Sequence, residues 1–150
     1  MSLIPQLFSR RARERSRRTA LQALYEAGMT GKSVAEILNR YADDAALKKA
    51  DRDYFRLLVK GTYEQRDEIE AIIQPLLERP LKEVDPVEQA VLFIGVYELL
   101  HQPDMPVRAV INEAIELAKM FGAEESHKYI NGVLDKAAHS VRSDEFTRDK

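Results

Sequence analysis

Hydrophobic residues recur at intervals of three and four along most of the chain, which is the spacing of one buried face of an α-helix. The pattern is clearest after Pro106, and a similar face returns in the segment that follows Gly122. No segment shows the convincing alternation of polar and apolar residues that is typical of a half-buried strand. The sequence therefore predicts an all-α fold. The face after Pro106 comprises Val107, Val110, Ile111, Ala114, Ile115, Ala118 and Phe121.

Two segments carry strong signals for the start of a helix. Ser33 and Glu36 have the capping-box spacing, in which each side chain satisfies a free backbone donor near the other. Asp85 is followed by Pro86, with Glu88 in the first turn, which combines a capping carboxylate with proline at the first helical position. The helix expected after Asp85 is apolar on nearly all sides, and such a helix is normally buried in the middle of a bundle.

Other residues predict where helices stop. A first helix is expected over about residues 10–27, and a long one from Asp51 to Pro75, where proline cannot continue the backbone hydrogen bonding. Gly122 is expected to end the helix after Pro106 in the left-handed conformation.

One domain with two helical halves is the organisation that this pattern predicts. Residues 78–84 contain a proline and little regular pattern, so we place the junction between the halves there. The N-terminal half then covers about residues 10–77 and the C-terminal half about residues 85–139. Residues 1–9 and 140–150 are expected to be flexible.

The bulk composition excludes several classes of protein. The chain has 150 residues and no cysteine, so disulfides, a thiolate nucleophile and cysteine-based metal sites are excluded. No apolar stretch approaches the roughly 20 residues of a membrane span. The N-terminus lacks the basic-first order of a signal peptide. A cytoplasmic location without membrane contact is therefore expected.

A run of arginines gives the chain a strong local charge, although the net charge is −2. Six arginines and one acidic residue, Glu14, lie between Arg10 and Arg18. Arginine can grip phosphate with two donors at once and can stack on bases. The run fits a site for RNA or another polyanion, and it equally fits a solvated helix end. The candidate RNA-binding residues are Arg10, Arg11, Arg13, Arg15 and Arg17.

Two Glu-x-x-His pairs, Glu98–His101 and Glu124–His127, have the spacing that di-iron carboxylate bundles use. Glu113 or Glu116 could supply the further carboxylates that such a centre needs. Both histidines are expected near helix ends, where capping and surface roles explain them more simply. No glycine-rich phosphate loop is present, and no nucleophile stands at motif spacing from a histidine. We therefore expect neither an enzyme nor a metal or other cofactor.

Ser126–Tyr129 is a second candidate for contact with RNA. A histidine, a lysine and an aromatic ring in the first turn of a helix combine positive charge, stacking and free backbone amides. The alternative is a half-buried core tyrosine beside a solvated lysine.

Three motifs, taken in their order along the chain, resemble the NusB family of bacterial transcription antitermination proteins. The string "INEAIELAK-FGAEESHKYINGVLDK" is the strongest match. It is joined by Asp85–Glu88 at the start of the apolar helix and by Ala20–Tyr25 after the arginines. The resemblance covers about Arg13 to Ala138.

The resemblance implies an all-α fold of two small helical bundles and a non-enzymatic role in transcription antitermination. Proteins of this family bind the single-stranded boxA element of nascent RNA, especially in ribosomal RNA leaders. They do so with NusE, a small-subunit ribosomal protein, and the pair then joins NusA, NusG and RNA polymerase.

Carried onto this chain, the family's RNA surface would comprise Arg13, Arg15, Arg17, Lys128 and Tyr129. The NusE surface would include Tyr25 and Glu88. The family usually has an acidic residue just before the segment Ala20–Tyr25. Here Glu14 lies within the arginine run instead, and Arg18 takes the position that the acidic residue often holds.

Two alternatives keep the fold but change the function. The chain could form a homodimer that buries the RNA or partner surface and acts as an inactive store. It could also be the RNA-binding module of a ribosomal RNA cytosine methyltransferase, which needs a further domain with a catalytic cysteine that this sequence does not contain.

Overall fold

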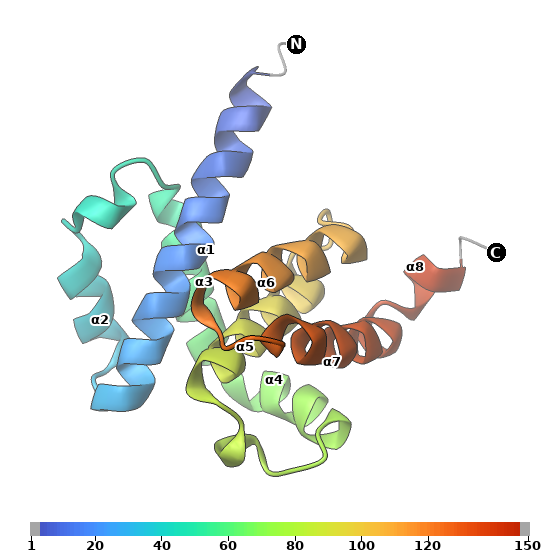
Figure 1. Ribbon diagram of the computed structural model, residues 1–150. Helices are drawn as coiled ribbons and strands as arrows, with labels where there is room; N and C mark the ends of the chain where they lie inside the picture. Colours follow the sequence, from blue (N-terminus) through green and yellow to red (C-terminus); the bar gives the residue numbers. More distant parts are fainter. Residues whose placement is uncertain (1–3, 148–150) are drawn as a thin grey trace. The chain divides into compact units, whose positions relative to one another are not determined.

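A computed structural model describes the backbone of residues 4–147 and the side chains of residues 10–146 (Figure 1). Within residues 4–147 all regular structure is α-helix or short 3₁₀-helix, and no strand occurs. The predicted all-α fold is therefore confirmed. Residues 1–3 and 148–150, which belong to the ends expected to be flexible, lie outside the described residues.

The chain divides into two compact units, Met1–Tyr63 and Glu64–Lys150. This boundary lies one helix earlier than the junction that the sequence suggests at residues 78–84. The difference arises because the helix that precedes residues 78–84 packs against the helices that follow them.

The N-terminal unit begins with a helix that is longer than predicted. It starts at Ile4, within the end expected to be flexible, and continues to Thr30. Gly31 then takes a positive φ of 73°, and its amide donates to Ala27 at 3.0 Å, which is a left-handed stop. Helix α1 packs against α2 and η1. The elements of this unit are α1 (Ile4–Thr30), α2 (Val34–Tyr41), η1 (Ala45–Leu47) and α3 (Arg52–Glu64).

The capping box predicted at Ser33 is present. The Glu36 amide donates to Ser33 Oγ at 3.1 Å, and the Ser33 amide donates to Glu36 Oε1 at 3.5 Å. Before α3, the Tyr54 amide donates to Asp51 Oδ1 at 3.0 Å. Each cap satisfies a backbone donor that the first turn of a helix leaves free.

The single helix expected from Asp51 to Pro75 is two helices. Helix α3 ends at Glu64, and α4 (Arg66–Ile73) follows after Gln65, whose φ and ψ are −100° and 15°. The apolar spacing continues through this break, so no local signal marks it. Packing decides it, because α4 contacts α5 and α7 in the C-terminal unit. The stop before Pro75 is confirmed.

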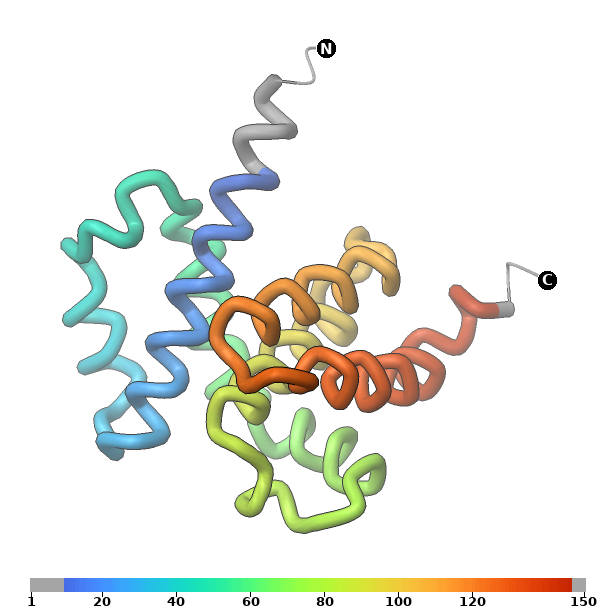
Figure 2. Tube along the Cα trace, viewed as in Figure 1, coloured from blue at the N-terminus to red at the C-terminus, as the bar shows by residue number. Residues whose placement is uncertain are grey.

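Helix α5 (Pro86–His101) is the centre of the C-terminal unit, as predicted from its apolar composition. It contacts α4, α6 and α7, and nearly every residue from Ala90 to Leu99 is buried. Figure 2 shows the chain reaching it from α4 through the segment that holds η2 and η3. The other elements are η2 (Gln74–Leu76), η3 (Leu81–Glu83), α6 (Val107–Phe121), α7 (Ser126–Val141) and α8 (Ser143–Thr147).

Two glycines of this unit are explained by close packing. A Cβ atom on Gly95 would lie 2.9 Å from Cδ1 of Leu134, so the glycine lets α7 approach α5. Gly122 ends α6, but with φ −90° and ψ 173° it is extended, and the predicted left-handed conformation is wrong. Its Cβ would lie 2.8 Å from the Ala118 oxygen and 2.9 Å from Ser126 Oγ. Lack of space, and not backbone handedness, requires glycine there.

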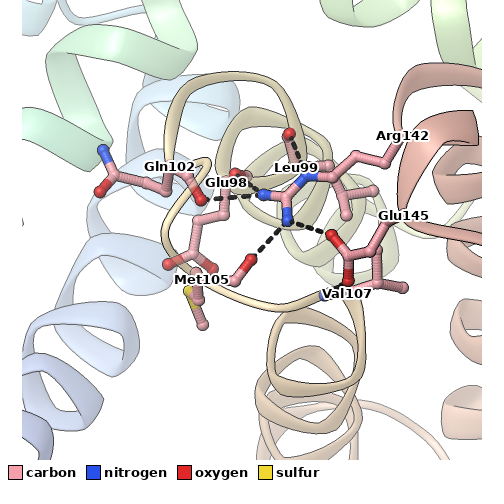
Figure 3. Close-up of polar contacts among 7 residues, drawn as sticks. All are labelled: Glu98, Leu99, Gln102, Met105, Val107, Arg142 and Glu145. Atoms are coloured by element: carbon pink, nitrogen blue, oxygen red, sulfur yellow. Dashed lines mark hydrogen bonds and ion pairs between the residues drawn. The ribbon is translucent and has the colours of Figure 1, made fainter. Parts of the chain in front are cut away.

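Arg142, in the C-terminal end expected to be flexible, connects that end to the α5–α6 loop (Figure 3). Its side chain is 9% exposed, and it donates to the Leu99 and Gln102 carbonyl oxygens at 2.8 Å each. It also donates to the Glu98 and Met105 oxygens at 3.1 and 2.5 Å. These contacts place a positive charge beside the carbonyl oxygens at the C-terminal end of α5 and in the loop that follows it.

Glu145 performs the complementary role on the same loop. Its Oε2 accepts from the Val107 amide at 2.9 Å, in the first turn of α6, and its Oε1 lies 3.2 Å from Arg142 Nη1. A carboxylate is favourable at a helix N-terminus because the free amides there carry partial positive charge. Arg142 caps the end of α5 and Glu145 caps the start of α6. These contacts hold residues 142–145 against the α5–α6 loop, and helical structure continues to Thr147.

We expect Arg142→Ala to lower the free energy of unfolding by about 2–4 kcal/mol, because several buried carbonyl oxygens lose a charged donor. Urea denaturation measures this change. The control is Arg108→Ala, which removes the same charge from an exposed site on α6 and should change stability by less than about 0.5 kcal/mol. Equal midpoints for the two variants would contradict the capping role.

Alanine at two glycines should change stability in opposite directions. Gly95→Ala should destabilise by about 1–3 kcal/mol, because the added methyl group collides with buried Leu134. Gly132→Ala should stabilise by about 0.5–1 kcal/mol, because Gly132 is exposed in α7 with nothing within 4 Å of an added Cβ. Thermal and urea denaturation of both variants would test this, and a shift of the same sign would refute it.

Candidate nucleic-acid interface

The arginine run lies on α1, and its members differ in exposure. Arg10, Arg11 and Arg13 are exposed, and Arg15 is partly exposed. Arg17, by contrast, is 5% exposed. Four of the five arginines predicted to contact RNA are therefore accessible to solvent, and the fifth is not.

Arg13 is held at the start of α3. Its Nε lies 3.8 Å from Asp51 Oδ2, and its guanidinium carbon lies 4.7 Å from the centroid of the Tyr54 ring. The backbone beneath it is fixed, because the Asp51 amide donates to the Ala12 oxygen and Ser16 Oγ lies 2.6 Å from the Asp51 oxygen. The backbone that carries Arg13 is thus fixed, and its side chain is exposed.

Arg17 supports this arrangement from the buried side of α1. Its guanidinium carbon lies 5.4 Å from the same Tyr54 ring. The reason is helical geometry: Ala20 and Leu21, three and four residues later, are buried, so position 17 shares their face. The spacing of Arg17 from Ala20 and Leu21 in the sequence indicates a buried position. Its charge instead suggested an exposed one. Arg17, one of the predicted RNA contacts, is a buried residue of α1.

The second group of predicted RNA contacts lies at the start of α7, which begins at Ser126 as expected. Lys128 is 70% exposed at its side chain, and its Nζ lies 2.6 Å from Glu125 Oε2. Glu125 has a φ of 73°, a left-handed conformation that is uncommon for a residue with a side chain. Backbone strain therefore lies at the entrance to the helix that carries Lys128.

Tyr129 is partly buried and lies against a cation that sequence reasoning did not identify. The guanidinium carbon of Arg79 lies 5.8 Å from the centroid of the Tyr129 ring. The Tyr129 hydroxyl is buried, and within the described part of the chain it has no hydrogen-bond partner. Arg79 and Tyr129 are fifty positions apart, so no local pattern could have paired them.

The predicted RNA residues therefore form two groups, one in each unit. The arginine group, Arg10–Arg15, belongs to α1 of the N-terminal unit, and the second group, Lys128 and Tyr129, belongs to α7 of the C-terminal unit. Both groups present cations, and both place a guanidinium beside a tyrosine ring.

The two residues predicted to contact NusE also differ. Tyr25 is 40% exposed on α1, and Met29, one turn later, is exposed as well. Glu88 is half-buried, and its Oε2 accepts from Ser126 Oγ at 2.5 Å. This contact joins the first turn of α5 to the first turn of α7. Glu88 thus holds in place the turn that carries Lys128 and Tyr129.

The Glu-x-x-His pairs do not assemble a metal centre. Among the described residues, no group of three or more His, Asp or Glu side chains could hold a metal ion. His101 Nε2 lies 3.2 Å from Glu68 Oε1, and Glu98 is 1% exposed in the core. In the same part of the chain, no helix is long and apolar enough to cross a membrane.

Comparison with known proteins places this geometry in a family. The model of the NusB family matches residues 14–139. The transcription antitermination protein NusB of Methylobacillus flagellatus is 44% identical over 140 residues, which is 93% of this chain and 91% of that protein. The chain belongs to the NusB family. Membership gives it a role in transcription antitermination, which is not an enzymatic activity.

Solved NusB structures share the fold. NusB of T. maritima superposes with a TM-score of 0.77 at 30% sequence identity, covering 89% of this chain and 96% of that one. A complex of the antitermination factors NusB and NusE with double-stranded RNA matches with a TM-score of 0.78 at 27% identity. That match covers 87% of this chain and 98% of the other.

We expect Arg17 and Arg11 to differ in their effect on stability. Arg17→Ala should lower the free energy of unfolding by about 1–3 kcal/mol, because it removes a packed side chain from beside buried Tyr54. Arg11→Ala, on the exposed side of the same helix, should change it by less than about 0.5 kcal/mol. Urea denaturation of both variants gives the comparison, and equal effects would show that Arg17 is not packed.

Proposed function

We propose that this protein binds boxA-type single-stranded RNA of ribosomal RNA leader transcripts together with NusE, in the cytoplasm. The pair then joins NusA, NusG and RNA polymerase as an antitermination complex. The observation that carries the proposal is the exposure of Arg10, Arg11 and Arg13 on one helix in a member of the NusB family. Exposed arginines suit contacts to phosphate, because the guanidinium offers a fork of donors.

The weak pairing of these arginines supports a role in binding. Arg10 Nε lies 3.7 Å from Glu14 Oε1 on the same helix, and Arg13 lies 3.8 Å from the Asp51 carboxylate. Exposed ion pairs of this kind contribute between about 0 and 1 kcal/mol each. A phosphate can therefore replace either carboxylate at small cost.

In this proposal NusE contacts Tyr25 and Glu88, and its binding strengthens the contact with RNA. Tyr25 offers an exposed aromatic ring, the residue type that is enriched at protein interfaces. Glu88 accepts a hydrogen bond from Ser126 in the first turn of α7. A partner that contacts Glu88 would therefore contact the residue that holds this turn in place. Long arginine side chains lose entropy when they are immobilised. We therefore expect weak binding by the protein alone and tight binding by the heterodimer.

The test is binding of a labelled boxA-type RNA, with and without NusE, over a range of salt concentrations. If three or four phosphates are contacted, the slope of log affinity against log salt is about −2 to −3 for single-stranded RNA. The triple variant Arg10→Ala, Arg11→Ala, Arg13→Ala should bind weakly and with a flatter slope.

A matched control removes the same charge elsewhere in the N-terminal unit. Lys48→Ala, Lys49→Ala and Arg56→Ala, combined in one variant, change exposed cations outside α1 and should leave the slope unchanged. If both triple variants lose the same RNA affinity, the loss comes from the change in net charge and not from the arginines of α1.

Two further readouts distinguish the alternatives. A duplex of the same sequence, used as competitor, separates single-stranded from double-stranded recognition. Sedimentation at several concentrations measures homodimer formation. No RNA binding even with NusE, together with a stable homodimer, would overturn the proposal in favour of a storage form.

A further inference from the structure

Arg79 lies in the connection between η2 and η3, and the backbone on either side of its carbonyl is held in place. Gln74 Nε2 donates to the Arg79 oxygen at 3.2 Å, and Gln74 Oε1 accepts from the Leu81 amide at 2.9 Å. One amide side chain thus bridges both sides of Pro80. The connection presents Arg79 from a fixed backbone, although the residue itself is exposed.

The side chain of Arg79 is available to a ligand. Within the described residues it forms no ion pair, whereas Lys128, which precedes Tyr129 in the chain, is paired with Glu125 at 2.6 Å. Its described contact is with the Tyr129 ring, at 5.8 Å. An exposed cation–π contact contributes little to stability, so a nucleotide can displace it easily.

Tyr129 carries a feature that packing does not explain. Its hydroxyl is buried without a hydrogen-bond partner in the described structure, and a buried donor left in this way is unfavourable. Phenylalanine would fill the same space without that penalty. The ring, and not the hydroxyl, is therefore the part of Tyr129 that the surrounding side chains present to a ligand.

We propose that Arg79 contacts RNA and forms, with the Tyr129 ring, a site for one nucleotide of a single strand. The base stacks on the ring where the guanidinium now lies, and the guanidinium turns to the adjacent phosphate. Stacking on an aromatic ring combined with a nearby arginine is a general means of holding single-stranded RNA. This inference rests on the proposed function and adds to it a residue from a different element.

The experiment measures boxA-type RNA binding by the full chain in the presence of NusE. Arg79→Ala should lower affinity about five- to tenfold and reduce the magnitude of the salt slope by about 0.7, the contribution of one phosphate on a single strand. Arg79→Lys should retain the slope, because the charge remains. Arg108→Ala, which removes an exposed arginine from α6 of the same unit, should match the wild type.

Variants of Tyr129 and Gln74 separate contact from support. Tyr129→Phe should bind RNA like the wild type, and Tyr129→Leu should lose affinity, because only the ring is needed. The loss in the double variant Arg79→Ala, Tyr129→Leu should be smaller than the product of the single losses. Gln74→Ala should weaken binding slightly without changing the slope, because it loosens the connection and leaves the charge.

The outcomes distinguish this inference from the function on which it rests. If the wild type binds RNA with NusE and Arg79→Ala equals Arg108→Ala, the inference is wrong and the proposed function stands. If Arg79→Ala weakens NusE binding measured without RNA, Arg79 is a protein contact and the inference is again wrong. If the wild type does not bind RNA, both are overturned. Melting temperatures of all variants, measured without RNA, confirm that they fold.

Discussion

The burial of α5 from Ala90 to Leu99 is the constraint on which the C-terminal unit depends. A helix that is apolar on nearly all sides has to be covered by others, and α4, α6 and α7 provide the cover. Gly95 allows α7 to approach closely, and the contact of Glu88 with Ser126 fixes the first turn of α7. The position of Tyr129 in the first turn of α7 is therefore a consequence of core packing.

In the N-terminal unit, one helix contributes both to the core and to the charged surface. Ser16, Arg17 and Ala20 lie on the buried side of α1, and Arg10 and Arg13 lie exposed. Because 3.6 residues make one turn, six arginines in nine positions cannot all face solvent on a helix that is packed on one side. Arg17 is therefore buried beside Tyr54, and the exposed arginines are the ones that a ligand can reach.

Local chemistry could be predicted from the sequence, and contacts between distant residues could not. The caps at Ser33 and Asp85 involve neighbouring residues, so their spacing was sufficient. The break at Gln65 and the contact of Arg79 with Tyr129 depend on helices that meet only in the folded chain. Gly122 shows a third case, because glycine was identified correctly as a stop but for the wrong reason. Close approach of Ser126, and not a positive φ, requires it.

The ion pairs explain how a chain with net charge −2 can present sites for a polyanion. Arg10, Arg13 and Lys128 each have one carboxylate nearby, and all three side chains remain at least 47% exposed. Water and salt screen such pairs, so each carboxylate reduces the field of its cation without binding it tightly. A phosphate that replaces a carboxylate gains a charged contact and returns the acidic group to solvent. The net gain for each exchange is small, so several exchanges and a partner protein are needed for tight binding. This requirement favours assembly on RNA over binding by the protein alone.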